Sequence, residues 1–248
     1  MNSKFFSIIT VTLNSEKTLE ETILSVLNQT CKDFEYIVID GKSSDNTISI
    51  LKKYEKYLTI FIQKDNGIAE ALNRGISKSN GKWIHILNSD DKYSDNFCLE
   101  NAKKVLVEDK LNYFQMYFSD INGLIKSKNN WEYNFFIPYL RACIPHPSMI
   151  LNKEQYNKIG FYDEKFSITF DHDLTLRLLR TGLRPVKHNF VLTTKRDGGV
   201  THQNPKKVIT EFRLILIKNG VPNYLANLIF ILKILLFNIK KYIYKKFK

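Results

Sequence analysis

The ten residues Lys82–Asp91, KWIHILNSDD, lead from a continuous apolar run into two adjacent carboxylates. Trp83–Leu87 has the pattern of a strand that is buried on both faces of a sheet. Asp90 and Asp91 follow at the point where this strand leaves the core. Adjacent carboxylates repel each other more strongly as solvent is removed, and a bound Mg²⁺ reverses this cost. The alternative interpretation is a solvated turn, in which Asp and Asn bond to their own backbone.

Three similar strands are predicted before this stretch, at Phe5–Leu13, Glu35–Asp40 and Leu58–Gln63. Apolar residues at helical spacing follow each of them. This alternation predicts an α/β fold, in which a mostly parallel sheet carries helices on both faces. Ligands of such sheets bind beyond the carboxyl ends of the strands. The candidate binding residues at these ends are Thr12, Asn14, Asp40, Asp65, Asn66, Asp90 and Asp91.

Beyond residue 110 the pattern is less regular. Strands are expected at Tyr113–Asp120, Asn122–Lys126, Ser148–Leu151 and Val186–Thr193, and helices at Gln155–Gly160 and Asp171–Leu179. No linker composition separates this part of the chain from the first. We therefore expect residues 1–110 and 111–220 to be two halves of one domain, followed by a tail at 221–248. A separate second domain is the alternative.

Composition narrows the class of protein. Of the 248 residues, 44% are hydrophobic, which is enough for a packed core and argues against global disorder. Cys31, Cys98 and Cys143 form no CxxC pair and no metal-ligand spacing, which favours a reducing, cytoplasmic location. The first residues, MNSKFFSIITVTLN, lack the long apolar stretch of a signal peptide, and we interpret them as the first strand.

Five ordered blocks of sequence carry a resemblance to a known family. They are Ser7–Asn14 (SIITVTLN), Thr22–Thr30 (TILSVLNQT), Tyr36–Thr47 (YIVIDGKSSDNT), Asp65–Ile76 (DNGIAEALNRGI) and the NSDD that ends at Asp91. Together they resemble the nucleotide-sugar-binding half of the family 2 glycosyltransferases, which have a GT-A fold. The combination of DNGI, ALNRGI and LNSDD is similar to bacterial enzymes of O-antigen, capsule and related surface-glycan assembly. The resemblance implies that residues 1–110 bind the donor and that residues 111–220 bind the acceptor and carry the base.

The resemblance also implies a nucleotide site. Its members would be Thr10, Val11, Thr12, Asn14, Asp40, Asn73, Arg74 and Asp90. The first three would line the base pocket, partly through their backbone. Asp40 would accept a hydrogen bond from the base, as expected for the N3–H of uracil. Asn73 and Arg74 would lie near the base, the ribose or the diphosphate.

A metal ion, Mg²⁺ or Mn²⁺, is implied by the same resemblance. Asp91 would bind the ion directly, Asp90 would contact the ribose or support the metal, and His202 would touch the metal or a phosphate. Many relatives have Asp where Asn88 stands, which leaves the choice of metal open. Asp45, in the third block, is explained equally well as a helix cap.

The stretch Phe170–Leu178, FDHDLTLRL, is the other acid-rich segment. Direct displacement needs a base that takes the proton of the acceptor hydroxyl while its oxygen attacks the anomeric carbon. The stretch resembles the family's ED motif at a helix start, which implies Asp171 as the base and Asp173 as an orienting acid, although Phe170 replaces the usual Glu. The alternatives are that Asp171 only caps the helix and that Asp173 only pairs with Arg177.

Two further residues are candidates for contacts with the substrates. His146 lies between two prolines that favour an extended backbone, and relatives often have a His near this point that faces the site. Arg196 begins a segment with two glycines, RDGGVTH, which resembles the loop that closes over the donor. A structural role for His146 and a simple turn at the glycines are the alternatives.

The segment Tyr224–Lys248 contains six lysines and no acid, in a chain of net charge +12. Its apolar residues recur at helical spacing, but the run is shorter than the ~20 residues of a membrane span. We expect a basic amphipathic helix on the anionic inner face of the cell membrane, which suits an acceptor carried on a polyprenyl diphosphate lipid. A helix packed on the domain is the alternative. Nucleic acid is not expected, because no stacking motif is present.

The sequence thus predicts an inverting, metal-dependent glycosyltransferase that moves a sugar from a UDP-sugar to a lipid-linked glycan in bacterial surface polysaccharide synthesis. A metal-dependent nucleotidyltransferase is one alternative, but it would favour a glycine-rich basic loop after the first strand. A non-catalytic module that binds membrane or nucleic acid through the tail is the other. The donor sugar, the linkage and the oligomeric state are not predicted.

Overall fold

Strand β1 (Phe6–Thr12) lies inside a nine-stranded sheet. The computed structural model describes residues 4–129, 132–134, 136–141, 144–199 and 204–246. The strand order is β3-β2-β1-β4-β8-β6-β9-β5, with β7 paired to β6 outside this path. β2 (Phe34–Asp40), β3 (Thr59–Ile62) and β4 (Trp83–Ile86) form a parallel group with β1. These four strands confirm the predicted α/β fold class.

The sheet continues into the second half of the chain. β8 (Met149–Asn152) lies antiparallel between β4 and β6 (Lys110–Ser119), and β6 pairs in parallel with β9 (Arg184–Arg196). The short strands β5 (Lys92–Tyr93) and β7 (Ile125–Lys128) run antiparallel to β9 and β6. The two halves of the chain therefore share one mixed sheet.

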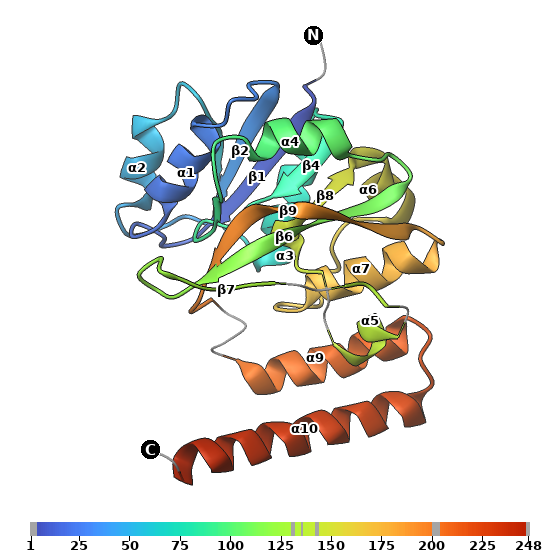
Figure 1. The fold of residues 1–248 in the computed structure, drawn as a ribbon. Coiled ribbons are helices and arrows are strands. Elements are labelled where there is room, and N and C mark those ends of the chain that lie inside the picture. The colour runs from blue at the N-terminus through green and yellow to red at the C-terminus, as the bar shows by residue number, and fades with distance from the viewer. Residues whose placement is uncertain (1–3, 130–131, 135, 142–143, 200–203, 247–248) are drawn as a thin grey trace.

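Helices cover both faces of this sheet (Figure 1). One face carries α1 (Leu19–Leu27), α2 (Thr47–Lys53) and α4 (Cys98–Val105). The other carries α3 (Ile68–Lys78), α6 (Lys153–Ile159) and α7 (Phe170–Arg180). Ile8 packs into the first layer and Ile9 into the second, because neighbouring side chains of a strand point to opposite faces. This burial on both sides explains the continuous apolar runs of the central strands.

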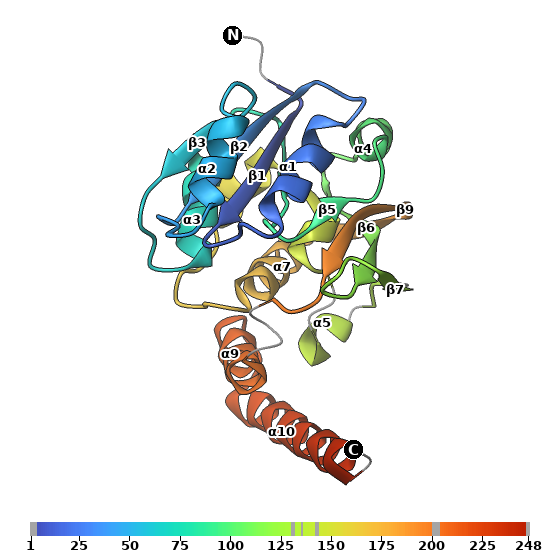
Figure 2. The same ribbon diagram turned by 90° about the vertical axis from the view of Figure 1, so that its left-hand side faces the viewer.

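Besides the two-residue strand β5, three elements lie in stretches for which no element is predicted from the sequence. They are the helix α5 (Ile137–Leu140), the single 3₁₀ turn η1 (His146–Ser148) and the helix α9 (Pro205–Lys218). α9 and the last helix, α10 (Asn223–Lys246), lie together at the end of the molecule opposite the N-terminus (Figures 1 and 2). α9 is anchored to the layer of α7 by Phe212, Ile215 and Leu216, all buried.

α10 leaves much of its apolar surface exposed. Its exposed large apolar side chains are Tyr224, Leu225, Leu228, Ile231, Leu232, Leu235, Leu236, Ile239, Tyr242 and Ile243. Among the residues that the structure describes, no helix has the length and apolar character needed to cross a bilayer. The helix predicted for the tail is confirmed; Ala226 and Ile229 pack against the domain, whereas most of its large apolar residues are exposed.

β1 and β4 are neighbours in the sheet, although β2 and β3 lie between them in the sequence. The chain leaves β1 toward β2 and β3 and then returns to β4 on the other side of β1. Connections therefore diverge beyond the carboxyl ends of β1 and β4, which is where α/β sheets form binding sites. Thr12 ends β1, and Asp90 and Asp91 follow β4, so the structure brings these residues to that point.

Candidate active site

Side-chain hydrogen bonds join the loops that follow β1 and β2. Asp40 is fully buried, and its two carboxylate oxygens accept from the Ser43 N–H at 2.9 Å and the Ser43 hydroxyl at 2.6 Å. Asn14 donates its N–H to the Ser43 hydroxyl oxygen at 2.9 Å and accepts the N–H of Ser44 at 2.8 Å. Its φ of 52° lies in the left-handed region, which Asn tolerates better than most residues. These contacts fix the shape of the predicted base pocket.

The three residues at the end of β1 lie in different surroundings. Thr10 is buried and donates its hydroxyl to the carbonyl oxygen of Leu87 at 2.7 Å, which ties β1 to the exit of β4. Val11 packs against the core. The buried hydroxyl of Thr12 has no hydrogen-bond partner within the described part of the chain. Because an unpaired buried hydroxyl is costly, Thr12 is the residue of the three with an unused polar group for a ligand.

Asn73 and Arg74 on α3 have protein partners. Arg74 contacts Asp65 at 2.6 Å and Glu70 at 2.9 Å. Burial raises the pKa of Asp65, and the charge of Arg74 opposes this shift. Asn73 donates to the carbonyl oxygen of Tyr162 at 2.9 Å and accepts its N–H at the same distance. The structure therefore places Arg74 in an ion-pair group beside the donor end of the sheet, whereas Asn73 holds the loop before α7.

Asp91 and Asp90 differ in exposure. Asp91 is 2% exposed, and its carboxylate accepts from the Asn88 side-chain amide at 2.9 Å and from the Arg196 N–H at 3.1 Å. Asp90 is half-buried. Burial and the neighbouring charge of Asp90 raise the pKa of Asp91 to about 7, and burial also raises the pKa of Asp90. The charged form of the pair is thus poorly stabilised by the protein groups around it.

Lys195, at the end of β9, is a site residue that the sequence does not single out. Its charge lies close enough to Asp90, Asp91 and Asp171 to oppose the rise that burial causes in the pKa of each. It is half-buried. In the sequence, Lys195 is marked only by its position as a polar residue at a strand end, beside Arg196. Lys195 brings positive charge to the point where a diphosphate would be expected.

His146 lies between the acidic pair and the predicted base. Its Nε2 lies 2.9 Å from the side-chain oxygen of Asn88, and its Nδ1 lies 3.8 Å from a carboxylate oxygen of Asp171. The ring also stacks on Phe170, with 5.8 Å between the centroids. Burial lowers the pKa of His146 to about 3, and the charge of Lys195 adds to this effect, so the ring is neutral at ordinary pH. The structure therefore brings Asp91, Asn88, His146 and Asp171 close together. Hydrogen bonds join the first three, and the Nδ1 of His146, which has no hydrogen-bond partner among the described residues, lies 3.8 Å from Asp171.

Asp171 lies in the first turn of α7, and its side chain is 21% exposed. One carboxylate oxygen accepts the N–H of His172 at 2.8 Å. Burial raises the pKa of Asp171, and the positive charge of Lys195 opposes the rise. A carboxylate whose pKa is raised toward neutrality, with part of its surface open, has the properties of a general base.

Asp173, the other acid of the motif, is fully buried. It accepts from the Arg177 Nε at 2.8 Å, the Lys218 Nζ at 2.9 Å and the Asn219 side-chain amide at 3.1 Å. The pairing with Arg177 agrees with the alternative interpretation of this residue. Asp173 holds α7 against α9 and presents no surface to a substrate.

The remaining predicted residues, Arg196, His202 and Asp45, differ in how the structure bears on their predicted roles. The backbone of Arg196 contacts Asp91, while its guanidinium group pairs with Glu21 on α1. His202 lies outside the described residues. Asp45 accepts the N–H of Thr47, the first residue of α2, at 3.0 Å, which agrees with a capping role. Arg196 thus reaches the acidic pair through its main chain.

A divalent ion would have to be held by Asp90 and Asp91. Among the described residues, no group of three or more His, Cys, Asp or Glu side chains is arranged to hold a metal. Mg²⁺ usually takes only one or two protein carboxylates and completes its shell with phosphates and water. Burial raises the pKa of both acids, and a bound cation would stabilise their charged forms. The residues present fit a metal shared with a diphosphate.

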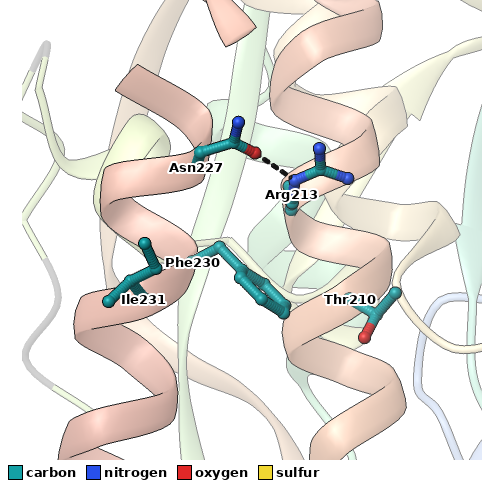
Figure 3. A pocket seen from close by; sticks show the side chains of 5 residues that line it. All are labelled: Thr210, Arg213, Asn227, Phe230 and Ile231. Atoms are coloured by element: carbon teal, nitrogen blue, oxygen red, sulfur yellow. Dashed lines mark hydrogen bonds between the residues drawn. The ribbon is translucent and has the colours of Figure 1, made fainter. Parts of the chain in front are cut away.

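A shallow crevice of about 370 Å³ lies elsewhere, between α9 and α10 (Figure 3). It is lined by Thr210, Arg213, Asn227, Phe230 and Ile231, and Arg213 donates to the Asn227 side-chain oxygen across it at 2.6 Å. None of these residues belongs to the group around Asp91 and Asp171. The crevice is therefore separate from the candidate active site.

Known proteins with similar structures share this architecture. A 1–349 fragment of S. aureus TarS in complex with UDP-GlcNAc has a TM-score of 0.65 and 19% identity, covering 91% of this chain and 70% of that one. The mannosyltransferase PcManGT of Pyrobaculum calidifontis, in complex with GDP-Man and Mn²⁺, has a TM-score of 0.66 and 16% identity over 92% of this chain and 70% of that one. The match spans 42% of a longer TarS chain. At these identities the likeness shows a GT-A fold.

Sequence comparison adds the family. A PGL/p-HBAD biosynthesis glycosyltransferase of Mycobacterium bovis is 28% identical over 184 residues, which cover 71% of this chain and 70% of that protein. The family model described as "Glycosyl transferase family 2" matches residues 7–171. This range contains the polar ends of β1, β2 and β4 and reaches Asp171. The chain therefore belongs to glycosyl transferase family 2.

Proposed function

We propose that this protein transfers a sugar from a UDP-sugar to a lipid-linked glycan acceptor of bacterial surface polysaccharide synthesis, with a divalent metal on the donor and Asp171 as the base. The coarser statement follows from the family: the chain is an inverting glycosyltransferase that uses a nucleotide sugar. The observation that carries the finer proposal is the proximity of the acidic pair to Asp171 at the switch point of the sheet. Hydrogen bonds join Asp91 to Asn88 and Asn88 to His146, and the ring of His146 lies 3.8 Å from the partly exposed carboxylate of Asp171.

The donor is proposed to bind beyond the ends of β1, β2 and β4. The loops fixed by Asp40 and Asn14 would enclose the base, and the free hydroxyl of Thr12 is a group that a bound nucleotide would satisfy. The TarS fragment resembles this chain and holds UDP-GlcNAc, which supports a uridine donor. The carboxylates of Asp90 and Asp91 would hold Mg²⁺ or Mn²⁺, which neutralises the diphosphate as it leaves.

The proposed transfer is a single displacement. The acceptor oxygen forms a bond to the anomeric carbon while the bond from that carbon to the diphosphate oxygen breaks, and UDP leaves with the bonding electrons. Asp171 takes the proton of the acceptor hydroxyl. Lys195, whose charge acts on both Asp91 and Asp171, adds electrostatic stabilisation between the two ends of the reaction. An α-linked donor would give a β-linked product.

The acceptor is proposed to be presented at the inner face of the cell membrane. α10 supports this, because its exposed apolar side chains have no covering element in the described structure and its segment carries lysines without acids. A helix of this composition lies in the interface of an anionic bilayer. A polyprenyl-diphosphate-linked glycan is an acceptor that would be reached from that position.

The proposal is tested by incubating the protein with UDP-sugars, Mn²⁺ and membrane extract and measuring UDP release. Wild type is expected to release UDP with at least one donor, and Asp91→Ala and Asp171→Ala to release far less. Equal release by all three proteins would remove both roles. Release of pyrophosphate from a nucleoside triphosphate in place of UDP release would favour a nucleotidyltransferase.

A further inference from the structure

Glu211 on α9 is a nearly buried carboxylate that accepts five hydrogen bonds from neutral donors. It is 6% exposed. One oxygen accepts the N–H and hydroxyl of Ser167 at 3.0 and 2.9 Å. The other accepts the N–H of Ile168 and the N–H and hydroxyl of Thr169, at 3.0, 3.0 and 2.9 Å. Burial alone would raise the pKa of Glu211, but these hydrogen bonds outweigh it and lower the pKa, so the group is a carboxylate.

These five hydrogen bonds all reach the short segment that leads into α7. Thr169 is the residue that caps this helix, and its side chain makes no capping bond to its own helix. Negative charge beside a helix N-terminus is favourable, and Glu211 supplies that charge from another element. Asp171 is the second residue of α7, two positions after Thr169. Glu211 therefore holds the three residues that lead directly into the first turn of α7.

α9 also holds the residues that follow Asp171. The ring of Phe212 stacks on His172, with 4.7 Å between the centroids and 9° between the planes. Lys218 and Asn219 bind Asp173 at 2.9 and 3.1 Å. Contacts from α9 thus bracket Asp171 on both sides, while the carboxylate of Asp171 faces His146 and the acidic pair.

We propose that Glu211 is a positioning residue for Asp171 and that it acts by fixing the segment 167–169. This inference rests on the proposed role of Asp171 as the base. The five donors of residues 167–169 are shared between the two carboxylate oxygens of Glu211, whereas a side-chain amide has only one oxygen that can accept hydrogen bonds. Replacing Glu211 by Gln turns one acceptor into a donor that opposes the N–H of its neighbours. The first turn of α7 would then shift, and the acceptor hydroxyl would lose its alignment with Asp171.

The experiment compares wild type with Glu211→Gln and with Arg213→Ala, using kcat for transfer together with calorimetric titration of UDP in the presence of Mn²⁺. Arg213 is on the same helix but points across the crevice to Asn227 on α10 (Figure 3). Its replacement disturbs α9 without touching α7, so it is the matched control. Glu211→Gln is expected to lower kcat by about 10- to 100-fold, because a displacement near 1 Å costs that much. The Kd and the binding stoichiometry of UDP are expected to stay unchanged, because the donor site lies on β1, β2 and β4.

The stoichiometry separates positioning from loss of folded protein. A fall in kcat that matches the fall in UDP-binding sites would overturn the inference, as would a kcat of Glu211→Gln equal to that of Arg213→Ala. If Glu211→Gln does not fold, Thr169→Val, which removes one hydroxyl donor to the same carboxylate, is expected to lower kcat at unchanged UDP Kd, and an unchanged kcat would overturn the inference. Transfer by wild type with no effect of either variant overturns this inference alone, whereas the absence of any transfer by wild type overturns the proposed function.

Discussion

The Nε2 atom of His146 lies 2.9 Å from the side-chain oxygen of Asn88. The amide nitrogen of the same Asn88 donates to Asp91 at 2.9 Å. Because the ring of His146 is neutral, its Nε2 carries the proton of this hydrogen bond and its Nδ1 is left toward Asp171. An amide accepts on one side and donates on the other, whereas a carboxylate accepts on both. The amide at position 88 is thus matched to its two neighbours.

Asn88→Asp is expected to destabilise the protein by about 1–3 kcal/mol in the absence of a divalent ion, because it replaces a donor to a buried carboxylate with a third negative charge. The same change should make Mn²⁺ more stabilising than it is in wild type. Unfolding in urea, with a chelator and with Mn²⁺, measures both effects. A variant as stable as wild type in chelator would show that the amide is not needed.

Asp171→Asn is expected to lower kcat by about 10²- to 10⁴-fold, since the amide cannot take a proton from the acceptor. The UDP-sugar should bind with unchanged affinity, because Asp171 lies on α7 and outside the loops that enclose the base. Transfer kinetics and donor titration test this together. A loss of donor affinity without a loss of kcat would assign Asp171 to the donor site.

Acid should destabilise the protein through His172. Burial lowers the pKa of this residue to about 4, and the charge of Lys233 on α10 adds to the shift, whereas the ring in the unfolded chain has a pKa of 6.5. The unfolded chain therefore binds the proton first, so the stabilisation is complete above pH 6.5 and is lost as the pH falls toward 4. The loss is about 1.4 kcal/mol per pH unit in this window for one group.

His172→Phe keeps a ring stacked on Phe212 and removes the titration. The free energy of unfolding of the variant is expected to fall by about 1 kcal/mol less than that of wild type between pH 6.5 and pH 5.5. Urea unfolding at the two pH values is the measurement. Equal falls in the two proteins would mean that His172 is protonated as readily in the folded state as in the unfolded chain.

α10 should bind anionic membranes through its exposed leucines. Replacing both Leu232 and Leu236, which are 50% and 58% exposed, by Ser is expected to weaken binding to phosphatidylglycerol-containing vesicles by at least about 10-fold. Val107→Ser, at an exposed apolar residue outside α10, is the control and should bind as wild type does. Vesicle sedimentation measures the binding. Equal sedimentation of the double variant and wild type would show that another surface mediates membrane binding.

The central part of the fold is predictable because its physical causes are local. The apolar run around Ile8 and Ile9 requires burial on both faces, and the structure provides it. The ends of strands are less predictable. β9 spans Arg184–Arg196 and is longer than the predicted strand Val186–Thr193. Pairing with β6 extends it over polar residues, which give no apolar pattern in the sequence. β8 was predicted within one residue, but its antiparallel direction depends on long-range pairing.

The candidate site is predictable at its acids and less so at their partners. Residue type and spacing do not distinguish Asp171 from Asp173, since the contacts of Lys218 and Asn219 with Asp173 come from a remote part of the chain. Asn73 has the same difficulty, because the loop at Tyr162 that binds it is remote in sequence. Glu211 did carry a signal, as a lone acid on the apolar face of its helix, four residues before Ile215. Lys195 has almost no feature in the sequence that would mark it as a site residue.

Calorimetric titration of UDP into wild type and Asp91→Asn, each with Mn²⁺ and with a chelator, tests the central claim most directly. If the acidic pair holds an ion shared with the diphosphate, wild type should bind UDP at least about 10-fold more tightly with Mn²⁺, and Asp91→Asn should show no such gain. Equal UDP affinity of wild type in Mn²⁺ and in chelator, or a full Mn²⁺ effect in Asp91→Asn, would contradict the account.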